Sequence, residues 1–223
     1  MIGVCPAQNS NFVVVLHFDG TNGSTTFTNS AIGGSTAWTS TGAGAVLAAP
    51  SFKFGTANLS LASSNYAHSN NSADFGSFGT GDFAFSFWIK RGSVAGVRQN
   101  TFGMGNAGLA GGYYIGKFDA ANTFTFGINE VQNVTTAAIT DTNQHNIEIN
   151  RVGNNLYIAL DGVFSAATDV TGVSANAAGG FSIGTLGDFG GSFFTGNVDE
   201  FVIVKGAHLH SASFTPYTSA FCP

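Results

Sequence analysis

The sequence contains few residues that could perform chemistry, and their spacing matches no common catalytic motif. No Gly-x-Ser-x-Gly turn, phosphate-binding loop or His-Glu-x-x-His zinc motif appears in the 223 residues. Asp199 and Glu200 are adjacent, and neighbouring side chains on a regular strand project to opposite faces, so this pair is not expected to act together on one substrate. His208 and His210 would share one side of an extended segment, but two ligands do not make a zinc site. We therefore expect the protein not to be an enzyme.

The two cysteines, Cys5 and Cys222, lie at opposite ends of the chain. Terminal strands of a β-sandwich are often neighbours, so one expectation is a disulfide between them in an oxidising environment. The other expectation is two unrelated free thiols. In the chain-entropy model the bridge would stabilise the fold by ~4 to 5 kcal/mol. The sequence does not supply the Cα separation that decides between the two.

The composition excludes several classes of protein. Charged residues make up 9% of the chain, with 7 Lys and Arg against 12 Asp and Glu, where about 25% is usual. With a formal net charge of -5 the chain offers no basic surface for a phosphate backbone, so nucleic acid is not an expected partner. No segment approaches the roughly 18 unbroken apolar residues of a membrane helix, so a membrane is not an expected partner either.

Short segments in which apolar and polar side chains alternate recur along the chain. In 83–89 every second side chain is Phe or Ile, and this set is expected to lie in the core. Segments 146–152 and 156–160 flank a Gly-Asn-Asn sequence and predict a hairpin. No segment of ten or more residues has a helical period, which favours an all-β fold.

The domain organisation predicted from the sequence is simple. No Pro-rich linker, charge run or change of composition divides the chain. Strand-like segments bounded by turn residues are typical of sandwiches and barrels. We therefore expect one domain over residues 1–223, a two-sheet antiparallel β-sandwich with its core at about residues 12–205.

Several blocks, taken in order, carry a family resemblance. The blocks are His17-Phe18-Asp19-Gly20, 53–61 (KFGTANLSL), 82–90 (DFAFSFWIK), 151–162 (RVGNNLYIALDG), 181–184 (FSIG) and 194–203 (FTGNVDEFVI). Together they resemble the concanavalin A-like lectin/glucanase superfamily, and most of all its laminin-G-like jelly-roll branch, over about residues 12–205. The resemblance implies a jelly-roll fold, but this fold carries many different activities.

The resemblance also bears on catalysis. Glucanases of the superfamily carry a Glu-x-Asp-x-x-Glu strand motif whose two glutamates act as nucleophile and acid/base. Here the matching segment is 197–202, with Asn197 and Val202 at the two catalytic positions. Glycosidase activity of that type is therefore not expected.

Related domains often hold a structural Ca²⁺ through carboxylates and backbone carbonyls. The resemblance implies as ligands Asp19, at the end of the first strand, and Asp199 or Glu200 on the last strand, because terminal strands pair in this fold. The alternative is that Asp19 caps a turn and Asp199 accepts hydrogen bonds from backbone donors. Both interpretations stay open at this point.

Exposed aromatic rings can stack on sugars, and they provide the candidate glycan-binding residues. The candidates are Trp38, Tyr66, Tyr113 and Tyr114. Trp88 is instead expected in the core between the sheets, because its strand is apolar on both faces. Loops 62–78 and 91–112 at the edge of the sandwich are expected to form the recognition surface.

Domains with this resemblance and a low-charge, Gly- and Asn-rich composition are similar to those found in bacteriophage particles. No secretory signal is visible, and Met1 favours exit from the cell by another route, such as lysis. The first functional hypothesis is therefore a non-enzymatic structural module at the virion surface, a head decoration, tail or fibre protein. It would be present in many copies, contact capsid or tail proteins, and bind host glycans. The alternative is a secreted, extracellular bacterial carbohydrate-binding module with calcium-dependent sugar recognition.

Overall fold

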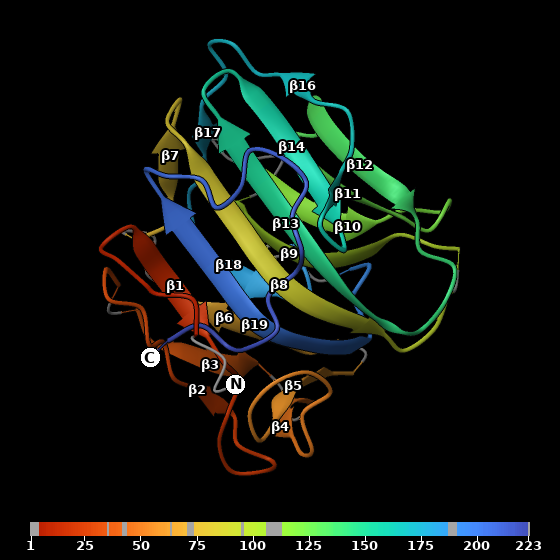
Figure 1. The fold of residues 1–223 in the computed structure, drawn as a ribbon. Coiled ribbons are helices and arrows are strands. Elements are labelled where there is room, and N and C mark those ends of the chain that lie inside the picture. The colour runs from red at the N-terminus through yellow and green to blue at the C-terminus, as the bar shows by residue number, and fades with distance from the viewer. Residues whose placement is uncertain are drawn as a thin grey trace.

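The computed structural model describes residues 5–34, 36–41, 44–62, 64–70, 74–94, 96–105, 113–186 and 191–222. These residues form strands joined by turns and loops, as Figure 1 shows. Within them there is no helix long and apolar enough to cross a membrane. Two large antiparallel sheets face each other, so the expectation of an all-β sandwich is confirmed.

The first sheet, called sheet A here, contains nine strands among the described residues, in the order β15-β14-β13-β8-β19-β5-β4. In addition, β1 pairs with β19 and β16 pairs with β14. The strands are β1 (Phe12–Leu16), β4 (Ala45–Ala48), β5 (Asn58–Leu61), β8 (Phe83–Arg91), β13 (Gln144–Val152), β14 (Asn155–Leu160), β15 (Val163–Phe164), β16 (Thr168–Asp169) and β19 (Gly196–Lys205). The hairpin expected around residues 153–155 is the β13–β14 pair.

The second sheet, sheet B, contains eight strands in the described part of the chain, in the order β12-β11-β10-β9-β18-β6-β3-β2. The strands are β2 (Thr26–Phe27), β3 (Trp38–Thr41), β6 (Tyr66–Ser69), β9 (Gln99–Gly105), β10 (Tyr113–Phe118), β11 (Thr123–Ile128), β12 (Gln132–Ala138) and β18 (Phe181–Ile183). A separate short pair is formed by β7 (Ser77–Gly79) and β17 (Ala175–Asn176).

The main core lies between sheets A and B and is rich in phenylalanine. Alternate residues of β8 point into it, including Phe83, Phe85 and Phe87, all of them fully buried. From sheet B, Phe102 stacks on Phe85 with ring centroids 5.1 Å apart. Large rings packed in this way bury much apolar area and add specific edge and face contacts, which stabilise the sandwich.

The outer face of sheet A is also covered, which is unusual for an antiparallel sheet. Residues 206–222, here called the C-terminal strap, cross this face over β13, β8 and β19 (Figure 1). Beneath the strap lies a second apolar cluster. Its buried members are Phe12, Val15, Ala31, Ala84, Val202, Val204 and Phe221, with Ala207, Leu209 and Tyr217 packed against them. This cover explains why β8 is buried on both faces.

A second segment, 51–57, covers the outer face nearer the other end of β8, and is called the covering loop here. Phe54 of this loop packs edge-on against Trp88 with ring centroids 6.2 Å apart. Lys53 Nζ lies 3.5 Å from the centre of the Trp88 ring. Trp88 is buried as expected, but its place between the sheets was predicted wrongly. The reason is that alternation along β8 puts Trp88 on the outer face with Ala84.

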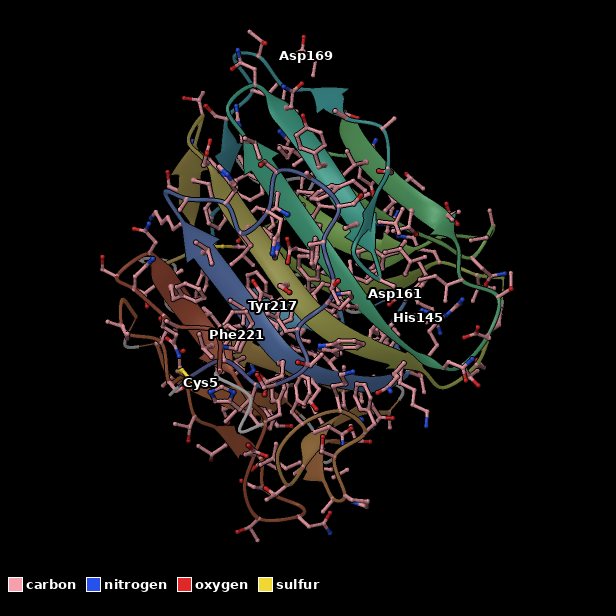
Figure 2. The ribbon with its side chains drawn as sticks, in the orientation of Figure 1. Cys5, His145, Asp161, Asp169, Tyr217 and Phe221 are labelled. Atoms are coloured by element: carbon pink, nitrogen blue, oxygen red, sulfur yellow. A yellow bond between two sulfur atoms is a disulfide. The ribbon has the colours of Figure 1, made fainter. Side chains whose placement is uncertain are left out.

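The two ends of the described chain lie side by side. Cys5 and Cys222 are joined by a disulfide, with their Cα atoms 5.2 Å apart. The backbone N–H of Cys222 also donates to the carbonyl of Pro6 at 2.9 Å. Figure 2 places Cys5 close to the end of the strap, near Phe221. The strap is therefore tied at its far end to the segment that precedes β1.

Candidate functional site

Asp199 and Glu200 lie at a bulge in β19, where the register with β8 shifts and Glu200 has a φ of +50°. Asp199 accepts hydrogen bonds from Ser51 Oγ at 2.8 Å and from the backbone N–H of Phe54 at 3.2 Å. Glu200 accepts one from the backbone N–H of Phe221 at 3.3 Å. Both carboxylates therefore project from the outer face. The expectation of opposite faces was wrong, because the extra residue of a bulge breaks the alternation.

Further protein groups contact Glu200 and the third acidic candidate, Asp19. His17 Nδ1 lies 3.0 Å from both carboxylate oxygens of Glu200. Burial lowers the pKa of His17, but the hydrogen bond and charge of Glu200 outweigh this, and the pKa is raised. Asp19 accepts hydrogen bonds from Thr56 Oγ1 at 3.1 Å and from the backbone N–H of Ala57 at 3.2 Å. Asp19 and Asp199 thus fix the two ends of the covering loop.

Calcium needs six to eight oxygen ligands, and this arrangement does not offer them. The carboxylates of Asp19, Asp199 and Glu200 are turned toward N–H and O–H donors, which a cation would have to displace. Burial also raises the pKa of Asp199 to about 7, and the neighbouring charge of Glu200 acts in the same direction. In the part of the chain that the structure describes, no group of three or more His, Cys, Asp or Glu could hold a metal ion. As arranged, these residues do not fit Ca²⁺.

Two of the four aromatic candidates for glycan binding lie in the core. Trp38 is 1% exposed and packs against Phe75 and Phe181. Tyr114 is fully buried, and its hydroxyl donates to the carbonyl of Phe75 at 2.9 Å. A ring without an exposed face cannot stack on a sugar, so the expectation was wrong for both. The reason is that alternation turns these two side chains toward the inner face of sheet B.

The other two aromatic candidates are nearer the surface. Tyr113 is 8% exposed, and its pKa is raised by burial and by the neighbouring charge of Glu130. Tyr66 is half-buried, and its ring lies edge-on to His68 at 5.7 Å. Of the two expected recognition loops, residues 63, 71–73, 95 and 106–112 lie outside the described residues.

A cleft of about 610 Å³ opens beside the covering loop, at the end of sheet A. It is lined by Phe52, Lys90, Thr142, Asn143 and Gln144. Lys90 and Gln144 are direct cross-strand partners on β8 and β13, so their side chains leave the same face of the sheet. Phe52 comes from the covering loop, and Asn143 comes from the turn before β13. Three separate segments of the chain thus build this cleft.

The turn that forms one wall of the cleft is held by a charged cluster. Asp141 Oδ1 accepts a hydrogen bond from the backbone N–H of Asn143 at 2.8 Å. His145 lies between Asp141, at 3.0 Å, and Asp161, at 2.7 Å (Figure 2 labels His145 and Asp161). The hydrogen bond to Asp161, with further help from Asp141, raises the pKa of His145 to about 9. His145 is therefore protonated at neutral pH, and its charge links the turn to the hairpin.

The groups lining the cleft can bind a polar ligand with an apolar face. Phe52 is half-buried and supplies a ring at the cleft. Asn143 and Gln144 each carry an amide that can both donate and accept, and Thr142 adds a hydroxyl. Lys90 adds an exposed ammonium group. A ring beside convergent hydrogen-bonding groups is the usual composition of a site for a small polar ligand.

Our sequence interpretation did not identify these lining residues. Phe52 lies between Pro50 and Gly55 in a segment rich in turn-forming residues. An aromatic residue in such a segment is a signal that could have been used, because loops lie at the surface. The polar residues carried no such signal, because their meeting at one place depends on the pairing of β8 with β13.

The geometry of the sandwich agrees with the comparison to known families. The Laminin_G_3 family model, described as the concanavalin A-like lectin/glucanases superfamily, matches residues 61–211. The chain therefore belongs to this superfamily. No curated protein matches the chain by sequence.

Solved structures with similar folds come from several kinds of protein. The binding domain of Paraclostridial Mosquitocidal Protein 1 has a TM-score of 0.68 at 12% identity, covering 90% of this chain and 50% of that one. Trypanosoma rangeli sialidase has a TM-score of 0.66 at 11% identity, covering 93% and 34%. Domain 4 of AbnA, an extracellular arabinanase from Geobacillus stearothermophilus solved with arabinotriose, has a TM-score of 0.64 at 14% identity, covering 89% and 94%. The chain thus spans half or less of the first two proteins. At these identities the likeness is one of fold.

Proposed function

We propose that the chain is a non-enzymatic binding module that recognises carbohydrate in the cleft beside the covering loop. The observation that carries the proposal is the half-buried ring of Phe52, which lines the cleft together with the amides of Asn143 and Gln144. A sugar ring presents C–H groups on one face and hydroxyls around its rim, and this combination of groups complements both.

Two further observations support a binding role rather than catalysis. Asp199 and Glu200 are 0% and 2% exposed and are engaged by the covering loop and the strap, so neither carboxylate reaches a substrate. The similar fold of the arabinanase domain, solved with arabinotriose, covers nearly the whole of both chains. A sandwich of similar size and fold thus occurs as one domain of an extracellular arabinanase.

A glycan array followed by calorimetry on the bound sugars tests this proposal. Phe52→Ala should weaken binding at least tenfold, because it removes the ring against which the sugar packs. The matched control is Tyr66→Ala, which removes another half-buried ring from the opposite sheet. If only Tyr66→Ala weakens binding, the site is on sheet B and the cleft is the wrong place. Absence of binding to any glycan on the array would remove the carbohydrate proposal.

The same measurement tests the calcium dependence that the family resemblance implies. The hydrogen bonds of Asp19, Asp199 and Glu200 lead us to expect the same sugar affinity and melting temperature in EDTA and in millimolar Ca²⁺. A melting temperature that rises with Ca²⁺ and falls with EDTA would show that these carboxylates rearrange to hold the ion.

The biological setting we propose is the surface of a bacteriophage particle. The low fraction of charged residues supports a surface suited to repeated contacts between protein copies. Mass spectrometry of purified particles should find the chain at many copies per particle, in contact with capsid or tail proteins. Its absence from particles would favour the alternative, a secreted bacterial carbohydrate-binding module.

A further inference from the structure

The positively charged residues of this protein are few, and most are engaged inside the molecule. Arg91 and Arg151 are 2% and 0% exposed and donate to backbone carbonyls. Arg98 and Lys117 both contact Glu130. A fifth, Lys53, lies over the ring of Trp88. Of the seven Lys and Arg residues in the chain, Lys90 and Lys205 remain. Among the described residues, neither of these two lysines lies within ion-pairing distance of a carboxylate.

Lys90 differs from Lys205 because it lines the cleft. It is exposed, and its cross-strand neighbours are Gln144 on β13 and Asn197 on β19. Opposite charges at such neighbouring positions stabilise a sheet, yet both neighbours here are neutral amides. Among the described residues that line the cleft, none carries a carboxylate. The ammonium group of Lys90 thus faces the cleft without a compensating negative charge there.

The charges around the cleft favour an anion, although the whole chain carries a formal charge of -5. Asp141 and Asp161 hold the protonated His145 between them, so this cluster is only partly negative. Lys53 and Lys90 add two positive charges beside it. Asp199, whose pKa burial raises to about 7, lies buried beneath the covering loop. Of the charged groups in this region, the one that lines the cleft itself is the ammonium group of Lys90.

We infer that this cleft selects sugars that carry a carboxylate, which the ammonium group of Lys90 binds. The amides of Asn143 and Gln144 then bind hydroxyl groups, and the ring of Phe52 packs against the face of the sugar. The inference rests on the proposed carbohydrate function and deepens it. A charge-assisted hydrogen bond is roughly twice as strong as a neutral one, so an acidic sugar should bind about tenfold more tightly than its neutral counterpart.

Paired probes make the test specific for the carboxylate. Sialyllactose is compared with lactose, and trigalacturonate with its carboxyl-reduced form, by calorimetry at about 50 and 300 mM salt. The two pairs distinguish a sialic acid from a uronic acid as the source of the carboxylate. We expect the acidic member of at least one pair to bind about tenfold more tightly, and this preference to shrink at the higher salt concentration.

Two variants carry the same change of charge. Lys90→Gln should lower the affinity for the acidic sugar about tenfold and its affinity for the neutral partner by much less, so that the preference for the acidic sugar is lost. Lys205→Gln is the control, because Lys205 lies at the other end of β19, about 26 Å from Asn197 at the usual rise per residue. It should change neither affinity.

The outcomes separate this inference from the proposal on which it rests. If the wild-type protein binds acidic and neutral partners equally, or if both lysine variants lose the preference, selection by Lys90 is overturned while the carbohydrate function stands. If neither probe pair binds while a glycan array shows other, neutral sugars bound, selection of a carboxylate is overturned and the carbohydrate function stands. If the array shows no bound sugar either, both are overturned.

Discussion

At the scale of single residues, buried hydrogen bonds separate the polar side chains that hold the fold from those available for binding. Glu148 is fully buried, and its Oε1 lies 2.8 Å from His210 and 2.7 Å from the amide nitrogen of Asn150. Tyr114 is equally enclosed. The groups of the cleft, such as Lys90, are exposed instead. Substitutions at the two kinds of position should therefore affect different measurements, stability in the first case and ligand affinity in the second.

Tyr114→Phe should lower the free energy of unfolding by about 1 kcal/mol, because the carbonyl of Phe75 loses its buried donor. Urea unfolding monitored by intrinsic fluorescence measures the change. Tyr66→Phe removes a hydroxyl from a half-exposed ring and should change the free energy by less than about 0.5 kcal/mol. Equal effects of the two variants would contradict the assignment of Tyr114 to the core.

The raised pKa of His145 predicts a pH dependence of stability. Its pKa of about 9 in the folded protein exceeds the unfolded value near 6.5. The stabilisation is therefore fully present below pH 6.5 and is lost as the pH rises through about 9. His145→Asn should remove this contribution, which we expect to be on the order of 1 kcal/mol because the cluster is partly exposed to solvent.

Urea unfolding of the wild type and His145→Asn at pH 6, 7.5 and 9.5 checks this prediction. The difference in free energy of unfolding between the two proteins should shrink as the pH rises. A difference that stays constant across this range would show that His145 does not carry its proton in the folded protein at neutral pH.

At the scale of elements, the C-terminal strap and the covering loop bury part of the outer face of sheet A. The C-terminal strap places Tyr217 and Phe221 over β8 and β19, as Figure 2 shows. The covering loop is held by Asp19 and Asp199, and it leaves the end of β8 with Lys90 uncovered. The cleft thus lies where neither the strap nor the covering loop covers sheet A.

Phe221→Ala should lower the free energy of unfolding by about 3 kcal/mol, the usual cost of truncating a buried phenylalanine. Phe221 is 4% exposed, and its ring lies 4.7 Å from Tyr217 and 5.6 Å from Phe12. Limited proteolysis should also cut this variant first within the strap, residues 206–222. Val163→Ala, at a side chain that is 67% exposed, is the control and should be nearly neutral. A stable variant with an uncut strap would show that the ring contributes little to the docking of the strap.

At the scale of the whole molecule, the disulfide between Cys5 and Cys222 closes nearly the entire chain into one loop. The last strand, β19, pairs with β8 and also with β1 and β5, so early and late segments of the sequence meet in the middle of sheet A. The bridge joins the two ends of the described chain, and it restricts the unfolded chain much more than the folded one.

Reduction, or the double substitution Cys5→Ser with Cys222→Ser, should lower the free energy of unfolding by up to about 5 kcal/mol in the chain-entropy model. The melting temperature of the wild type should fall on addition of dithiothreitol, while that of the double variant should not change. Equal melting temperatures of the wild type with and without reductant would contradict a stabilising bridge.

The sequence by itself determined the all-β class, the inward set of residues along β8 and the β13–β14 hairpin. These features depend on alternation and turn chemistry, which act between residues close in sequence. Alternation failed to predict the directions of Asp199 and Glu200, because a bulge in β19 turns both side chains to the outer face of sheet A. Alternation also did not predict whether Trp88 lies on the inner or the outer face of sheet A.

Only the tertiary structure decided which side chains meet. Trp38 and Tyr114 lie in the core because sheet B turns that face toward sheet A. Phe52, Lys90 and Asn143 line one cleft although up to 91 positions separate them in the sequence. The physical reason is that strand pairing and loop docking join residues distant along the chain. The free energy of those contacts depends on both of the segments that meet. A sequence pattern within one segment therefore does not predict them.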